Sequence, residues 1–174
     1  MKLKKIILLN IIIVFILSFP IHFLYEIIPN FITSILFPIN ESLFEHMKII
    51  FTSYILSNLI IYKLLKRINL TNNFKASIIL SITYNILIFL VLFYPIYLTT
   101  KHNLIVTLII YLISIVLTQI INYYVLKSYN PIINKLFIPI LVLYIIIFAI
   151  FTYYPLNNNF FIDYYNNKKG FSNY

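Results

Sequence analysis

The sequence predicts an all-α protein, a polytopic transmembrane helix bundle of about five spans, and its composition and apolar runs lead to this class. Of the 174 residues, 62% are hydrophobic and 10% are charged, whereas soluble domains have about 25% charged residues. The mean hydropathy of +0.97 agrees. We therefore expect residues 1–174 to form a single transmembrane domain with the lipid bilayer as its solvent.

The first apolar stretch follows a short basic segment and is predicted to be a retained span, residues 6–28. Its start resembles a secretory signal peptide, but no small-residue cleavage site follows, and the apolar run continues through Pro20 to Ile28. At the helical rise per residue this stretch covers roughly 34 Å, which is enough to cross a hydrocarbon core of about 30 Å.

Four further spans are predicted at residues 43–64, 76–97, 103–126 and 136–154. The second ends in a basic cluster that includes Lys66 and Arg67, and the loop after it is polar. Pro131 lies in the loop before the fifth span, and Pro155 begins a polar tail, residues 155–174. Proline interrupts helices, so these two positions are natural boundaries.

The basic residues predict an orientation for the bundle. With the amino end in the cytoplasm, nine of the 13 Lys and Arg residues fall on the cytoplasmic side and four on the other. This imbalance favours a multi-pass cell-membrane protein with a cytoplasmic amino end and an extracytoplasmic carboxyl end. Because membrane orientation already explains the formal charge of +9, we expect no nucleic-acid partner.

The absence of cysteine and the near-absence of glycine from the sequence exclude several kinds of site. The chain has no cysteine, so it has no disulfide, thiolate metal site or cysteine nucleophile. Its single glycine, Gly170, excludes GxxxG helix packing and glycine-rich phosphate-binding loops.

Polar side chains gather in one segment, which we call the polar box (residues 37–48), between the first two spans. It contains two of the four carboxylates in the chain, Glu41 and Glu45, together with His46 and Lys48. On a helix, Glu41, Glu45 and Lys48 would form one stripe. His22 and Glu26 end the first span with the spacing of one helical turn.

With the predicted orientation, all four acidic residues are expected on the extracytoplasmic side of the membrane. Ionisable groups at the edge of the hydrocarbon indicate a functional site. The candidate catalytic residues are Glu45 and His46. The candidate metal ligands are His22, Glu26, Glu41, His46 and Asp163. Histidine nitrogen and carboxylate oxygen suit a divalent metal such as zinc, although neither H-E-x-x-H nor paired E-x-x-H is present. We predict no other cofactor.

Two structural explanations stand beside this functional one. Ser42 and Glu45 have the spacing of a capping box, in which Ser42 accepts from the Glu45 amide and Glu45 reaches back. Ion pairing within the cluster could also serve only to fasten the first two spans to each other.

The polar box resembles a segment of an uncharacterised family of small bacterial integral-membrane proteins, which reads P-V-N-E-S-x-W-E-H-x-K. Here the segment runs from Pro38 to Lys48, with Phe44 in place of tryptophan. The similarity extends to His22–Glu26 and to the tail around Asp163, where the family's prolines are missing. The resemblance implies a shared bundle and a shared box but no activity.

Three functions remain open at this level, and the sequence does not decide whether the protein is an enzyme. One is a membrane-embedded metal-dependent hydrolase, in which the cluster holds a metal ion that activates water. The second is a small transporter or receptor component, whose path would continue through Asn85 and Gln119 inside the spans. The third is a structural membrane scaffold.

Overall fold

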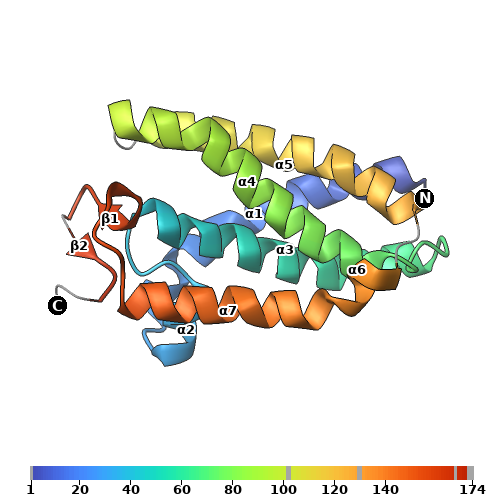
Figure 1. Cartoon of the computed structure of the whole chain (residues 1–174). Coiled ribbons are helices and arrows are strands. Elements are labelled where there is room, and N and C mark those ends of the chain that lie inside the picture. Colours follow the sequence, from blue (N-terminus) through green and yellow to red (C-terminus); the bar gives the residue numbers. More distant parts are fainter. Residues whose placement is uncertain (1, 101–102, 129–130, 167, 172–174) are drawn as a thin grey trace.

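The structure is a computed structural model, and it describes residues 2–100, 103–128, 131–166 and 168–171. It is an all-α bundle with a small folded tail (Figure 1). Its helices are α1 (Leu3–Ile27), α2 (Phe31–Leu36), α3 (Leu43–Lys66), α4 (Phe74–Thr100), α5 (Leu104–Lys127), α6 (Pro131–Lys135) and α7 (Phe137–Tyr153). The tail has a 3₁₀ turn, η1 (Asn159–Phe161), and two short strands, β1 (Ile162–Asp163) and β2 (Lys168–Lys169).

Four helices, α1, α3, α4 and α5, are long and apolar enough to cross a membrane. The fifth apolar helix, α7, has 17 residues, so at 1.5 Å per residue it is about 26 Å long and shorter than a typical hydrocarbon core. The fold class is as the composition predicts, and four to five helices of this kind indicate a multi-pass membrane protein.

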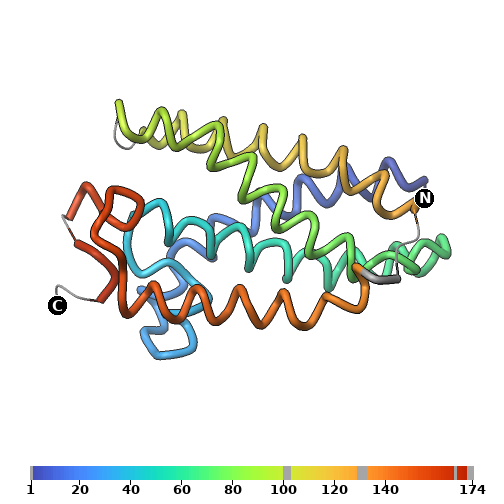
Figure 2. The backbone as a smooth tube through the Cα atoms, viewed as in Figure 1, coloured from blue at the N-terminus to red at the C-terminus, as the bar shows by residue number. Residues whose placement is uncertain are grey.

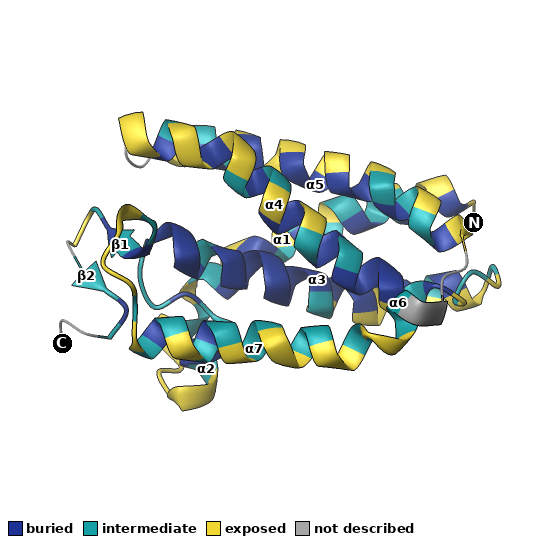
Figure 3. Cartoon of the chain, in the orientation of Figure 1, coloured by how far each residue is buried: buried dark blue, intermediate teal, exposed yellow. Residues whose placement is uncertain are grey.

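The long helices run back and forth along the bundle, as the tube in Figure 2 shows. The amino end lies at one end of the bundle and the carboxyl end at the other. In Figure 3 α3 is the helix whose surface is most fully buried, and it contacts α1, α2, α4 and the tail. The polar box therefore leads directly into the central helix.

Polar side chains define where several helices begin. Asn30 caps α2 and forms a reciprocal capping box with Thr33. Asn103 caps α5 by accepting from the Val106 amide at 3.2 Å. Ser42 caps α3 by accepting from the Glu45 amide at 3.4 Å. These side chains satisfy amides that the first turn of a helix leaves without partners.

The capping box expected at Ser42 and Glu45 is only half formed. The Glu45 carboxylate does not return to the Ser42 amide, which instead donates to the Asn40 side chain at 3.0 Å. Glu45 accepts from the Ile39 amide at 3.0 Å. The chain bends before α3, so the Ile39 amide is the one that the carboxylate meets.

The polar tail folds back over the end of the bundle where α3 begins (Figure 1). Phe161 is buried against Phe44, with ring centroids 4.9 Å apart, and the Tyr97 hydroxyl donates to the Ile162 carbonyl at 2.8 Å. Gly170 has a positive φ of 47°, and a Cβ there would lie 2.3 Å from the Thr152 carbonyl oxygen. Only glycine fits this approach without strain.

Candidate metal site

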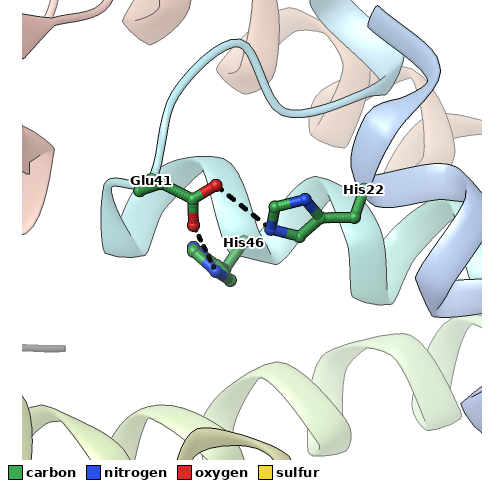
Figure 4. Close-up of side chains that lie close together, drawn as sticks. All are labelled: His22, Glu41 and His46. Atoms are coloured by element: carbon green, nitrogen blue, oxygen red, sulfur yellow. Dashed lines mark ion pairs between the residues drawn. The ribbon is translucent and has the colours of Figure 1, made fainter. Parts of the chain in front are cut away.

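Three side chains from separate segments meet at the end of the bundle near the tail: His22 of α1, Glu41 of the loop before α3, and His46 of α3 (Figure 4). His22 Nε2 lies 3.3 Å from Glu41 Oε1, and His46 Nε2 lies 3.6 Å from Glu41 Oε2. One ligand atom from each residue lies within 4.8 Å of the other two. We call these three residues the His/Glu cluster.

A hydrogen bond orients the His46 ring. His46 Nδ1 lies 2.9 Å from the Ser42 carbonyl oxygen. A carbonyl can only accept, so Nδ1 carries the hydrogen and Nε2 is the nitrogen turned toward Glu41. A neutral His46 then directs an Nε2 lone pair at a carboxylate, which is unfavourable unless a cation or a proton lies between them. Metal-binding histidines are commonly held by this kind of hydrogen bond.

The spacing of the cluster suits a tetrahedral metal ion. Zinc binds histidine nitrogen and carboxylate oxygen at about 2.0–2.2 Å, which places two tetrahedral ligands roughly 3.3–3.5 Å apart. The separations of 3.3 Å from His22 and 3.6 Å from His46 are close to that value. They end on different oxygens of Glu41, so the match holds for a carboxylate that binds the ion through both oxygens. Two histidines and one glutamate also form a known set of three protein ligands for catalytic zinc, in which the fourth position is open.

The cluster forms part of the wall of a cavity of about 540 Å³. The three side chains are partly exposed, at 27% for His22, 29% for Glu41 and 13% for His46. Most of the remaining wall is apolar and comes from α1, α3, α4 and α5. A ligand in the cavity could therefore reach the cluster, and the cavity volume lies within the range of about 300–1,000 Å³ for small-molecule sites.

Glu45 lies apart from the His/Glu cluster, in a buried ion pair with Lys48. Its Oε2 lies 2.6 Å from Lys48 Nζ, and the two side chains are 1% and 0% exposed. Consecutive residues on a helix differ in direction by about 100°, so Glu45 and His46 face different parts of the structure. We call Glu45 and Lys48 the buried pair.

The buried pair joins several segments of the chain. Lys48 also donates to the Ser34 carbonyl of α2 at 2.7 Å. Glu45 accepts from the Ile39 amide at 3.0 Å, and its other oxygen lies 3.4 Å from the Thr152 hydroxyl of α7, which donates at 2.6 Å to the Phe148 carbonyl. The polar groups of the pair are thus enclosed and hydrogen-bonded, as buried charges require.

The other two expected ligands are not part of the His/Glu cluster. Glu26 lies one turn after His22 and is exposed. Asp163 is buried in the tail, where it accepts from the Tyr165 amide at 2.8 Å and from the Asn166 side chain at 2.9 Å. The structure therefore brings His22, Glu41 and His46 together and separates Glu26, Glu45 and Asp163 from them.

Two tail residues that the sequence did not single out, Tyr165 and Asn166, also line the cavity. The Asp163 carboxylate accepts a hydrogen bond from the Asn166 side chain within the same turn of the tail. Asp163 therefore positions a residue of the cavity wall without lining the cavity itself. Ser18 and Tyr111 line the cavity between the helices. No local pattern in the sequence could have indicated these residues, because the folding of the tail and the helix contacts place them.

These features define the class of the protein. It is a helical bundle whose long apolar helices are compatible with a multi-pass membrane protein. It has a cluster of histidine and carboxylate side chains at one end of the bundle. It belongs to the family of unknown function DUF6512, which matches residues 1–171. The chain matches no curated protein and no solved structure.

Proposed function

We propose that this protein is a membrane-embedded metal-dependent hydrolase that holds a divalent transition metal ion, such as zinc, at His22, Glu41 and His46. The convergence of these three ligand atoms within 4.8 Å on the wall of a cavity is the observation that supports it. Ionisable groups at the edge of the hydrocarbon cost free energy unless they have partners. A metal ion would give all three side chains a common partner.

The proposed roles follow from the geometry of the cluster. His22, Glu41 and His46 would bind the ion, and the Ser42 carbonyl would keep His46 Nε2 directed at it. A zinc ion with three protein ligands lowers the pKa of a bound water to about 7 and so supplies a nucleophile at neutral pH. The open position would face the cavity, where a substrate could approach.

The orientation of the site belongs to the same proposal. The distribution of basic residues favours a cytoplasmic amino end and an extracytoplasmic carboxyl end, which would put all four acidic residues outside. The site would then act at the outer face of the cell membrane. We also propose a bacterial origin and the polar box as the segment that members of this family share.

The proposal is tested by metal analysis of detergent-purified protein after dialysis without chelator. The wild type should retain close to one equivalent of zinc or another transition metal. His22→Ala, Glu41→Ala and His46→Ala should each lose it. Glu26→Gln is the matched control, because Glu26 lies one turn from His22 but outside the cluster, and this variant should keep its metal.

Two results would overturn the proposal. One is a wild-type protein that binds no metal even when zinc is added. In that case, lower thermal stability of the His46→Ala variant would assign the cluster to fastening α1 against α3. The other is retention of the metal by His22→Ala, Glu41→Ala and His46→Ala alike, which would place the ion elsewhere.

A second candidate function is transport, and buried polar groups between the helices favour it. Asn85 donates to the Tyr54 hydroxyl at 3.3 Å, and Asn122 donates to Gln119 at 3.1 Å. Among the described residues, Asn10 has no hydrogen-bond partner for either atom of its side-chain amide. Unpaired polar groups inside a bundle are costly and indicate water or a passing solute.

An apolar cluster closes this polar region at the amino-terminal end of the bundle: Leu3, Ile6, Ile61, Leu65 and Leu126. Passage would therefore need a rearrangement of these helices, which is why transport ranks second. In proteoliposomes, transport of zinc should be impaired by Asn85→Leu and Gln119→Leu. Normal zinc flux in both variants, or none in the wild type, would eliminate this candidate.

A further inference from the structure

The cavity beside the His/Glu cluster is apolar along most of its wall and polar at one end. Its apolar wall is formed by side chains of four helices: Phe19 and Phe23 of α1, Ile49 and Ile50 of α3, Phe89 of α4, and Leu104 and Leu108 of α5. The polar groups are the His/Glu cluster together with Tyr165 and Asn166 of the tail. An occupant that matches this wall has an apolar body and a polar end.

Exposed lining residues show where the cavity reaches the outer surface of the bundle. Five of its lining residues are exposed: Tyr165 and Asn166 of the tail, and three apolar residues of the helices, Phe19 at 43%, Phe23 at 51% and Leu104 at 63%. The three apolar ones belong to α1 and α5, which are both long and apolar enough to cross a membrane. In a membrane protein, exposed apolar side chains on such helices face hydrocarbon, so these three residues would put one side of the cavity next to the lipid.

The position of the His/Glu cluster indicates which chemical group of a bound lipid would lie beside it. The residues of the cluster come from the last turns of α1 and the segment around the start of α3, and the tail residues Tyr165 and Asn166 line the same cavity. The cluster therefore lies at the boundary where the apolar wall meets the polar tail. In a glycerolipid the ester linkages lie at the same boundary, between the hydrocarbon chains and the headgroup. A chain lying in the cavity would bring its ester group next to the cluster.

We propose that the substrate is an ester-linked membrane lipid that enters from the bilayer between α1 and α5 and places one chain in the cavity. This inference rests on the proposed function and names its substrate class. In the reaction, the oxygen of a water molecule bonds to the ester carbonyl carbon, and the bond from that carbon to the alcohol oxygen breaks. The alcohol leaves with one proton of the water, and the other product is a fatty acid.

Lipid binding is tested first, because it can be measured without metal. Native mass spectrometry of the detergent-purified protein, incubated with phosphatidylglycerol, should show one bound lipid on metal-free wild type. Leu108→Trp fills the cavity from α5 and should lower the lipid affinity by about tenfold or more, or 1.4 kcal/mol. Leu117→Trp is the matched control, an exposed leucine of α5 that does not line the cavity, and it should bind lipid like the wild type.

Hydrolysis is tested next, with zinc-loaded protein and vesicles of the same phosphatidylglycerol. Free fatty acid should appear with the wild type and Leu117→Trp, and should fall about tenfold with Leu108→Trp. Glu41→Gln should release none but should still bind lipid, because Glu41 does not form the apolar wall.

The outcomes separate this inference from the proposed function. Metal binding without lipid binding, or equal lipid binding by Leu108→Trp and Leu117→Trp, would overturn the lipid inference and leave the metal site standing. Lipid binding in the cavity by a wild-type protein that takes up no zinc even when zinc is added would support the lipid site and overturn hydrolysis. Should Leu108→Trp fail to fold, Ile50→Trp fills the same cavity from α3.

Discussion

The buried pair and the His/Glu cluster both use residues of the first turns of α3, yet they differ in almost every physical respect. Glu45 and Lys48 are 1% and 0% exposed and are enclosed by α2, α7 and the preceding loop. His22, Glu41 and His46 are partly exposed and line a cavity. The comparison separates ionisable groups that hold the fold together from those that remain accessible to a ligand.

Burial explains why the two clusters should respond differently to mutation. A charge that is fully enclosed depends on its partner, because removal of the partner leaves a charge without solvation. A charge at a cavity wall is still reached by solvent, and its pairing contributes little to stability. Three substitutions, taken from the largest expected effect to the smallest, test this difference.

Lys48→Met should cause the largest loss of stability. It leaves the Glu45 carboxylate buried without its cation, and we expect the free energy of unfolding to fall by about 3–5 kcal/mol. Chemical unfolding of the detergent-solubilised protein measures this. The double variant Glu45→Gln/Lys48→Met should recover most of the loss, since the amide is neutral and its oxygen can still accept from the Ile39 amide.

Lys63→Met is the control for that experiment, because Lys63 is an exposed lysine of the same helix. Its stability should stay within about 0.5 kcal/mol of the wild type. If Lys48→Met is as stable as Lys63→Met, the buried pair does not hold the fold and the comparison fails.

Gly170→Ala should have an intermediate effect, confined to the tail, which helps to line the cavity beside the His/Glu cluster. The added Cβ would meet the Thr152 carbonyl at 2.3 Å in a backbone conformation with a positive φ, at a cost of about 1–3 kcal/mol. Hydrogen exchange at the Phe171 amide, which donates to Thr152, should speed up. Leu156→Ala, at an exposed position before the tail turn, should leave this exchange rate unchanged; equal rates in both variants would contradict the account.

Glu41→Gln should have the smallest effect on stability and a complete effect on metal binding. In the presence of chelator, we expect the free energy of unfolding to change by less than about 1 kcal/mol, because the carboxylate is partly exposed. Zinc titration should show the loss of the bound ion. A loss of stability in chelator as large as that of Lys48→Met would instead make the His/Glu cluster a second fastening point.

The helices could be predicted because each depends on local chemistry. Apolar stretches bounded by basic residues or proline give helices near the expected ranges, and Ser42 caps α3 as its sequence indicates. The site was predictable only in outline. Glu41 was expected to share a helical stripe with Glu45 and Lys48, but α3 begins at Leu43, so Glu41 lies before the helix and turns toward the histidines.

The sequence by itself determined that the long helices suit a lipid environment, because composition and the length of the apolar runs decide whether a helix can face hydrocarbon. It also determined that two of the four carboxylates lie in one segment with a histidine and a lysine. Only the tertiary structure divided these side chains between two clusters. His22 and Glu41 are 19 positions apart, and Glu45 and Thr152 are 107 apart. Which carboxylate meets a histidine and which meets a lysine depends on how α1, α3 and α7 pack, and helical periodicity within one segment contains no information about that packing.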